Sequence, residues 1–111
     1  MDITIYALKS CDSCKKAIKS LIAAGHDLKI LDVCGDGVPE GQLAEWLAKH
    51  GEDLVVNRKS TTWRGLDEAA RSAEPLALLM AHPTLLKRPV IIADGTSYIG
   101  WSKDVQAIFG L

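Results

Sequence analysis

The feature that most constrains this chain is the alternation of elements in its first 33 residues. Residues 3–8 are apolar and β-rich and predict a strand, and residues 28–33 predict a second. Between them, apolar side chains recur at helical spacing at Cys14, Ala17, Ile18, Leu21 and Ile22, and Gly25 follows where a helix would end. A strand, a helix and a second strand at this spacing form a βαβ unit, whose strands are parallel and joined by a right-handed crossover.

The rest of the chain predicts helices followed by a β-hairpin. A helix opening at Pro39 and ending at Gly51 is followed by short helical pieces to residue 82, of which 76–81 is apolar on nearly every side and is expected to be well buried. Strands at 90–93 and 96–99 flank Asp94-Gly95, a hairpin signal, and Ser102 can cap a last helix whose apolar residues are Val105, Ile108 and Phe109. The order βαβ, helices, ββα predicts an α/β, thioredoxin-like fold with a mixed sheet and a helical insertion at about residues 39–82, all within one domain of residues 1–111.

Composition and charge exclude several classes of protein. The chain has 111 residues, of which 48% are apolar and 24% charged, and this argues against disorder. A net charge of −1 argues against direct nucleic-acid binding, which favours a basic excess. No apolar run approaches the ~20 residues of a membrane span, and the N-terminus does not resemble a signal peptide, so we expect a cytoplasmic protein with no membrane partner.

The three cysteines indicate the chemistry. Cys11 and Cys14 form a Cys-x-x-Cys pair where the first strand gives way to the helix. Backbone N–H groups and the helix dipole at this point favour a thiolate, so the pKa of Cys11 should fall below the free value of ~8.5, with Lys9, Lys15 and Lys16 adding to the effect. Cys14 lies one turn later, within reach of Cys11. We therefore expect Cys11 to attack first and Cys14 to resolve the mixed disulfide.

Other interpretations of the cysteines remain open. Both could be ordinary small apolar residues, or they could form a structural disulfide that a chain of this size does not need. A zinc site needs four ligands, and only Cys34 and three histidines remain, so no metal is expected. Cys34 follows the second predicted strand and is expected to be buried and inert.

Arg88-Pro89 is the second element of the predicted site. A thioredoxin-like fold places a cis-proline at this point of the chain, facing the active thiol, which would bring the Arg88 guanidinium near Cys11. There it could stabilise a thiolate or bind a carboxylate or oxyanion. The alternative is a surface arginine.

The third element is the block 57–64, Asn-Arg-Lys-Ser-Thr-Thr-Trp-Arg. Its cations and hydroxyls suit a lid that binds an anion or a peptide-like thiol, and the alternative is a solvated loop. We expect Trp63 and Trp46 to pack in the core, Trp101 to line the site or cover the sheet, and His82 to end its helix.

Together these blocks resemble the arsenate reductase/Spx family of thioredoxin-fold proteins, most closely its YffB-like branch. The resemblance rests on three stretches: Tyr6-x-x-Lys9-Ser10-Cys11-Asp12-Ser13-Cys14-Lys15-Lys16-Ala17, the block 57–64, and His82-Pro83-Thr84-Leu85-Leu86-Lys87-Arg88-Pro89. It implies an ArsC-like fold, a nucleophilic cysteine at Cys11 and an arginine before a cis-proline at Arg88. In the glutathione-coupled arsenate reductases, the cysteine attacks arsenate held by arginines, and external thiols complete the reduction.

We therefore expect a glutathione-linked thiol–disulfide oxidoreductase with no bound cofactor. Its partner would be glutathione or another small thiol or oxyanion. The catalytic candidates are Cys11, Cys14 and Arg88, and the substrate-binding candidates are Arg58, Arg64, Lys9 and Pro89. One alternative is a redox-sensing, Spx-like regulator that binds a protein partner such as RNA polymerase. A further alternative is arsenate reduction. Of the arginines that arsenate reductases place around the oxyanion, Arg88 alone has a clear counterpart in this chain. The regions of the other arginines are occupied here by Leu54, Val55, Val56, Gly100 and Trp101.

Overall fold

The computed structural model describes residues 2–111, whose contacts divide them into two compact units. Unit 1 comprises residues 2–36 and Arg88–Leu111, and unit 2 comprises Gly37–Lys87. Unit 2 contains the insertion expected at residues 39–82. The description of the whole chain as a single domain stays a prediction.

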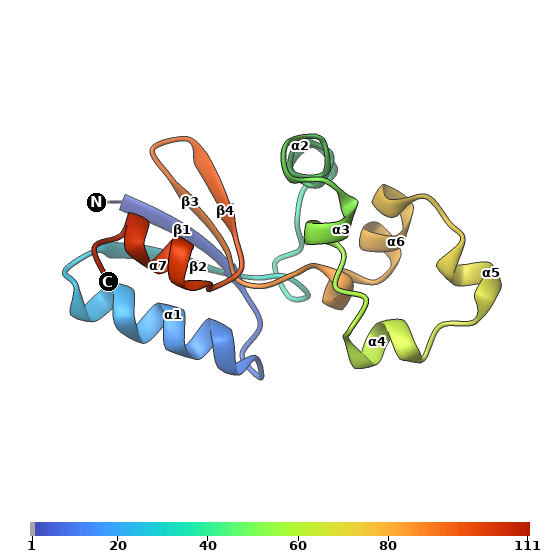
Figure 1. Cartoon of the computed structure of the whole chain (residues 1–111), viewed down its shortest axis with the longest axis horizontal. Helices are drawn as coiled ribbons and strands as arrows, with labels where there is room; N and C mark the ends of the chain where they lie inside the picture. Colours follow the sequence, from blue (N-terminus) through green and yellow to red (C-terminus); the bar gives the residue numbers. More distant parts are fainter. Residues whose placement is uncertain (1) are drawn as a thin grey trace. The chain divides into compact units, whose positions relative to one another are not determined.

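Unit 1 is built on a mixed sheet of four strands in the order β2-β1-β3-β4. These are β1 (Asp2–Ala7), β2 (Asp27–Asp32), β3 (Val90–Ala93) and β4 (Thr96–Ile99). β1 and β2 are parallel, whereas β1–β3 and β3–β4 are antiparallel. The βαβ prediction is confirmed, and this thioredoxin-like sheet leaves the C-terminal end of β1 next to that of β2 (Figure 1).

The hairpin between β3 and β4 follows from its two loop residues. Asp94 has φ of 51° and Gly95 has φ of 75°, the left-handed conformation that a tight hairpin turn of this type requires at both positions. Both strands begin and end where the sequence predicts.

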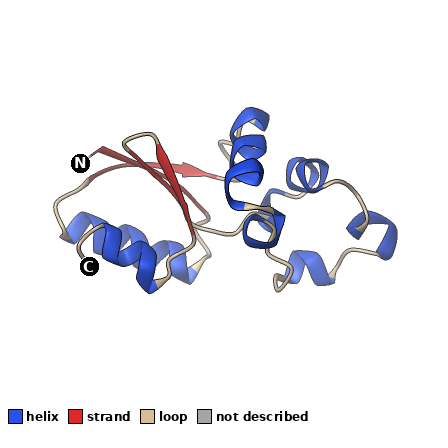
Figure 2. Cartoon of the chain, turned by 45° about the horizontal axis from the view of Figure 1, so that its top comes forward, coloured by secondary structure: helices blue, strands red, loops and turns tan. Residues whose placement is uncertain are grey.

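Helices α1 (Asp12–Ala23) and α7 (Lys103–Ile108) cover one face of the sheet (Figures 1 and 2). The buried cluster beneath them takes alternate residues of β1 and β3, as the pleat of a strand requires. Its members are Ile3, Ile5, Ala7, Ile91 and Ala93 from the strands, Cys14, Ala17 and Leu21 from α1, and Val105 with Phe109 from the C-terminal segment. Ser102 caps α7 by accepting a hydrogen bond from the Val105 N–H, as predicted.

Two residues predicted on these buried helix faces are exposed instead. Ile22 is 57% exposed and Ile108 is 53% exposed. Each lies about 100° round its helix from a buried neighbour, Leu21 and Phe109 respectively. The buried stripe of each helix is therefore narrower than the apolar pattern indicated.

Unit 2 is made of short helices, as predicted (Figure 2). They are α2 (Glu40–His50), α3 (Glu52–Val55), α4 (Thr61–Arg64), α5 (Glu68–Arg71), α6 (Pro75–Ala81) and a 3-10 turn, Pro83–Leu85. Pro39 immediately precedes α2 rather than opening it. The Lys87 N–H donates to the Val55 carbonyl at 2.8 Å, and the Asn57 N–H donates to the Leu85 carbonyl at 2.7 Å. These bonds join the middle of the unit, at residues 55–57, to its C-terminal end, at residues 85–87.

The expectation that residues 76–81 are well buried is wrong in part. Leu78 and Leu79 are buried, whereas Met80 is 48% exposed. Within unit 2, α6 packs against α2 and the 3-10 turn, and these contacts use one side of the helix. Trp46 of α2 is buried, as predicted. Among the described residues, no helix combines the length and apolarity that a membrane span requires.

Candidate functional site

Cys11 occupies the junction between β1 and α1. Its backbone is extended, with φ of −88° and ψ of 117°, and it is the residue that caps α1. The Cys11 N–H donates to the Leu8 carbonyl at 3.0 Å, and its own carbonyl accepts from Lys15 at 3.1 Å. The sulfur therefore lies at the end of α1 where unpaired N–H groups favour negative charge.

Unit 1 brings the three predicted catalytic residues together. Cys14 is one turn along α1 and is only 1% exposed, because it points into the cluster beneath the helix. Arg88 directly precedes Pro89 and β3, and the peptide bond between them is cis, as predicted. The Cys14 thiol and the Arg88 guanidinium both lie close enough to the Cys11 sulfur to lower the pKa of its thiol. Their catalytic roles stay a prediction.

The surroundings of Cys11 lower the pKa of its thiol below the ordinary value. Partial burial acts against this by raising the pKa. It is outweighed by hydrogen bonds from the backbone and the thiol of Cys14, and by the hydrogen bond and positive charge of Arg88. The pKa of Cys11 is therefore lowered by Cys14 and Arg88. The contribution that we expected from Lys9, Lys15 and Lys16 is not among its causes.

The pKa of Cys14 is shifted in the opposite direction, upward. Burial raises the pKa of its thiol to about 12, with smaller increases from the hydrogen bond and charge of Cys11. The backbone of Leu8 and the charge of Arg88 offset part of this rise. Both cysteines are free thiols in the structure, and at neutral pH Cys14 is therefore the proton-bearing member of the pair.

The end of β2 adds two acidic residues that the sequence analysis did not single out. Oδ1 of Asp32 accepts hydrogen bonds from the N–H groups of Cys34 and Gly35, both at 2.8 Å. Oδ2 of Asp36 accepts from the Asp32 N–H, also at 2.8 Å. Asp32 and Asp36 line a pocket that Lys9 and Cys14 also line. Their place just after β2, beside the end of β1, is the signal that could have identified them.

Cys34 is exposed, and the expectation that it is buried is wrong. The turn that Asp32 organises begins directly after β2, and Val33 takes the buried position. Cys34 therefore lies on the turn, where its side chain is in contact with solvent. The sequence did not indicate this exposure, because Cys34 directly follows an apolar stretch.

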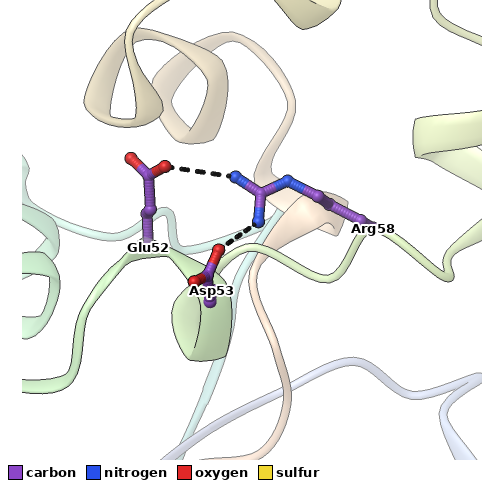
Figure 3. A network of polar contacts seen from close by, with 3 residues as sticks. All are labelled: Glu52, Asp53 and Arg58. Atoms are coloured by element: carbon purple, nitrogen blue, oxygen red, sulfur yellow. Dashed lines mark hydrogen bonds and ion pairs between the residues drawn. The ribbon is translucent and has the colours of Figure 1, made fainter.

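Arg58, predicted to bind substrate, lies in unit 2 and is engaged with acidic neighbours there (Figure 3). Its Nη1 is 2.8 Å from Oδ1 of Asp53, and its Nη2 is 3.5 Å from Oε1 of Glu52. The guanidinium also lies 5.6 Å from the ring centre of Trp63. The geometry gives Arg58 a local role in unit 2, and its substrate-binding role stays a prediction.

Trp63 is half-buried between two arginines rather than in a core. The guanidinium of Arg71 also lies over the Trp63 ring, 5.4 Å from its centre. Its Nε and Nη2 donate to the Trp63 carbonyl at 3.2 and 3.1 Å. Arg71 also donates to the Arg64 carbonyl at 3.3 Å, while the Arg64 side chain is exposed. The block 57–64 is thus fastened to α5. Its lid role and the anion-binding role of Arg64 stay predictions.

The remaining candidates occupy varied positions. Pro89 is buried, and its carbonyl accepts from the Gly100 N–H at 2.8 Å. Lys9 is exposed. Trp101 is half-buried against the cluster that Cys11 also contacts. His82 ends α6, as predicted, and its N–H donates to the Leu78 carbonyl at 2.8 Å. In the part of the chain that the structure describes, no three His, Cys, Asp or Glu side chains gather to hold a metal ion.

Comparison with known proteins identifies the family. The pattern that describes the ArsC family matches residues 6–109. The chain belongs to the ArsC family. An uncharacterized protein of Haemophilus influenzae is 40% identical and covers 96% of this chain and 98% of its own length. The global transcriptional regulator Spx of Streptococcus pyogenes is 24% identical and covers 92% of this chain and 80% of its own length.

Two solved structures show the same fold. The YFFB protein has a TM-score of 0.88 and 33% identity, covering 96% of each chain. An arsenate reductase (ArsC) related protein from Brucella melitensis has a TM-score of 0.75 and 34% identity, covering 100% of this chain and 97% of its own. These ArsC-family relatives confirm both the thioredoxin-like fold and the resemblance on which the sequence analysis relied.

Proposed function

We propose that this protein is a thiol–disulfide oxidoreductase with Cys11 as its nucleophile and Cys14 as its resolving thiol. The observation that supports this most directly is the placement of Cys11 at the start of α1, where Cys14 and Arg88 lower the pKa of its thiol. A thiolate is the nucleophilic form of cysteine, and each of these neighbours stabilises it. Cys11 is also partly accessible, as a nucleophile that meets a substrate must be.

The first step transfers the substrate sulfur to the protein. The Cys11 thiolate attacks one sulfur of a disulfide R–S–S–R, forms the mixed disulfide Cys11–S–S–R and expels R–S⁻, which takes a proton from water. Arg88 stabilises the thiolate before the attack and the departing anion beside it. One half of the substrate has then left as a thiol, and the other half is held in the mixed disulfide with Cys11.

In the second step, Cys14 attacks the Cys11 sulfur, and its proton passes through water to the departing thiolate. This forms the Cys11–Cys14 disulfide and releases the second R–S⁻, so that the protein has given up two electrons. Burial is the main cause of the raised pKa of Cys14, and a smaller part of the rise comes from the hydrogen bond and charge of Cys11. That contribution disappears once Cys11 is bonded to R, while the positive charge of Arg88 remains.

The co-substrate in this proposal is glutathione. It is a small thiol present in reducing compartments, and it can reduce the Cys11–Cys14 disulfide by the same exchange run in reverse. The cytoplasm is the matching location, because thiols remain reduced there.

Mass spectrometry with glutathione disulfide tests the proposal. We expect wild-type protein to form the Cys11–Cys14 disulfide and Cys14→Ser to accumulate one glutathione adduct at Cys11. Cys11→Ser should form neither product at a comparable rate. A Cys14→Ser protein that stays folded and gains no adduct at Cys11 would overturn the proposal.

A second candidate is a redox-regulated protein that binds a protein partner, supported by the similarity to the Spx regulator. In that case, the Cys11–Cys14 disulfide changes affinity instead of turning over a substrate. Purified RNA polymerase retained by the reduced and not by the oxidised form, or the reverse, would support this candidate. Equal retention of both forms, or retention of neither, would exclude polymerase as a redox-dependent partner.

Arsenate reduction is the third candidate, and the Brucella relative carries that activity in its name. Stabilising an oxyanion takes several positive groups around the nucleophile. Arg88 is the one arginine in the sequence of unit 1, which makes arsenate the least supported substrate. An arsenate turnover assay with glutathione tests it, and a rate above that of Cys11→Ser would restore this candidate.

A further inference from the structure

A pocket of about 320 Å³ lies in unit 1 between the start of α1 and the end of β2. Its apolar wall includes Ile18 of α1 and Ile30 of β2, and Ile30 is 49% exposed. The buried thiol Cys14 also lines it, so the pocket adjoins one member of the redox pair. Its volume falls within the range of small-molecule sites.

Charges of both signs surround this pocket. Lys9 and Lys15 supply two positive groups, and neither forms an ion pair in the part of the chain that the structure describes. Asp32 and Asp36 supply two carboxylates, each of which accepts hydrogen bonds from backbone N–H groups at one of its oxygens. The pKa of Asp32 is lowered by the N–H groups of Gly35 and Cys34 and by the charge of Lys9, so its carboxylate is ionised at neutral pH.

We propose that this pocket binds the zwitterionic, amino-acid-type end of the thiol co-substrate. The ligand's carboxylate meets Lys9 and Lys15, its ammonium meets Asp32 and Asp36, and its apolar stem lies along Ile18 and Ile30. A ligand with charge of one sign would satisfy two of these groups and face repulsion from the other two. This inference rests on the proposed function, because it names the substrate class of the same site.

The assignment moves carboxylate recognition away from Arg58. That guanidinium already has Asp53 and Glu52 as partners, so binding a carboxylate would require it to exchange them. Lys9 and Lys15 form no ion pair among the described residues, although the charge of Lys9 acts on Asp32, and both lie in the same unit as the two cysteines. Lys9 keeps the substrate-binding role that the sequence predicted, and Lys15, Asp32 and Asp36 join it.

Binding of S-methylglutathione, observed by NMR on ¹⁵N-labelled protein, tests the inference. The probe keeps both charges of the amino-acid end and cannot form a disulfide, so the measurement does not depend on catalysis. We expect saturable shifts at the backbone amides of Lys15, Ile30 and Gly35, which line the pocket. Shifts that map instead to residues 57–64, or no saturable shift at all, would overturn the inference.

Two neighbouring lysines provide a matched pair of variants. Lys15 and Lys16 are both exposed residues of α1, but only Lys15 lines the pocket. We expect Lys15→Gln to weaken probe binding about threefold to fivefold, the effect of losing one partly exposed ion pair, and Lys16→Gln to leave it unchanged. Equal effects of the two substitutions would indicate general attraction by the helix and contradict a specific pocket.

The inference and the proposed function can fail separately. If Cys14→Ser forms the glutathione adduct at Cys11 while the probe shifts map elsewhere, the pocket assignment fails and the thiol chemistry stands. If the probe binds in the pocket and glutathione disulfide forms no adduct at Cys11, the proposed function fails, and the pocket is a site for a zwitterion used in some other way.

Discussion

At the scale of single residues, Cys11 and Cys14 differ because their neighbours differ. Cys11 caps α1 and has a thiol whose pKa is lowered by Cys14 and Arg88, whereas Cys14 is buried among apolar side chains. Their spacing in the sequence predicted the lowered pKa of Cys11. The contribution of Arg88 was expected from the place of Arg88-Pro89 in a thioredoxin-like fold, whereas the spacing could not show that the nearby lysines do not contribute.

Replacing Arg88 should change the acidity of Cys11. We expect Arg88→Met to raise the pKa of Cys11, because it removes both a hydrogen bond and a positive charge from the thiolate. Arg88→Lys should restore part of the effect, since it keeps the charge. The pH dependence of Cys11 alkylation by iodoacetamide, located by mass spectrometry, measures this. An unchanged pKa in folded Arg88→Met would show that Arg88 does not stabilise the thiolate.

Cys34 provides a contrasting prediction. Because its side chain is exposed, Cys34→Ser should change the free energy of unfolding by less than about 0.5 kcal/mol. It should also leave the glutathione reaction at Cys11 unaffected. Urea unfolding and the adduct assay check the two expectations, and a loss of either stability or reactivity would give Cys34 a role that its exposure does not suggest.

At the scale of elements, the sequence predicted which segments are helices and strands better than which of their side chains are buried. Strong apolar periodicity and turn residues such as Asp94-Gly95 act locally, and they were sufficient for β3, β4 and α1. The width of a buried helix face depends on how the helix lies on the sheet, and this is why Ile22 was assigned to the wrong environment. The same reason applies to Met80 of α6.

Adjacent residues of α1 test this packing. Leu21→Ala should cost about 3 kcal/mol of unfolding free energy, because it removes a fully buried side chain and leaves a cavity. Ile22→Ala should cost less than about 0.5 kcal/mol, because that side chain is already mostly in solvent. Both are measured by urea unfolding. Similar costs for the two substitutions would mean that α1 is rotated relative to its position in the structure.

Arg71 joins α5 to the end of α4, a contact that no local pattern predicted. Arg71→Ala removes a cation–π contact and the hydrogen bonds to the carbonyls of Trp63 and Arg64. We expect it to lower the free energy of unfolding by about 1 kcal/mol and to increase hydrogen exchange in residues 57–71. Arg64→Ala is the control, since its side chain is exposed, and equal exchange in the two variants would contradict the account.

At the scale of the whole molecule, the order of elements carried most of what the sequence could reveal. The βαβ segment ends at Asp32 and the ββα segment begins at Val90, yet both form one sheet in unit 1, and the cis peptide bond at Arg88–Pro89 was expected from that topology. The pocket beside Cys14 was missed, because Asp32, Asp36 and Lys15 come from separate segments and none belongs to a motif. These residues line one pocket only because the fold brings α1 and the end of β2 together.

The central claim is that the folded chain, and not the local sequence around it, activates Cys11. The most direct test compares the pKa of Cys11 in native protein with its pKa in the urea-unfolded chain, from alkylation rates across pH in a Cys34→Ser background. We expect the native pKa to lie below the unfolded one, which should approach the free value of ~8.5. Equal values in the two states would contradict the claim, because the contacts with Arg88 and Cys14 exist only in the fold.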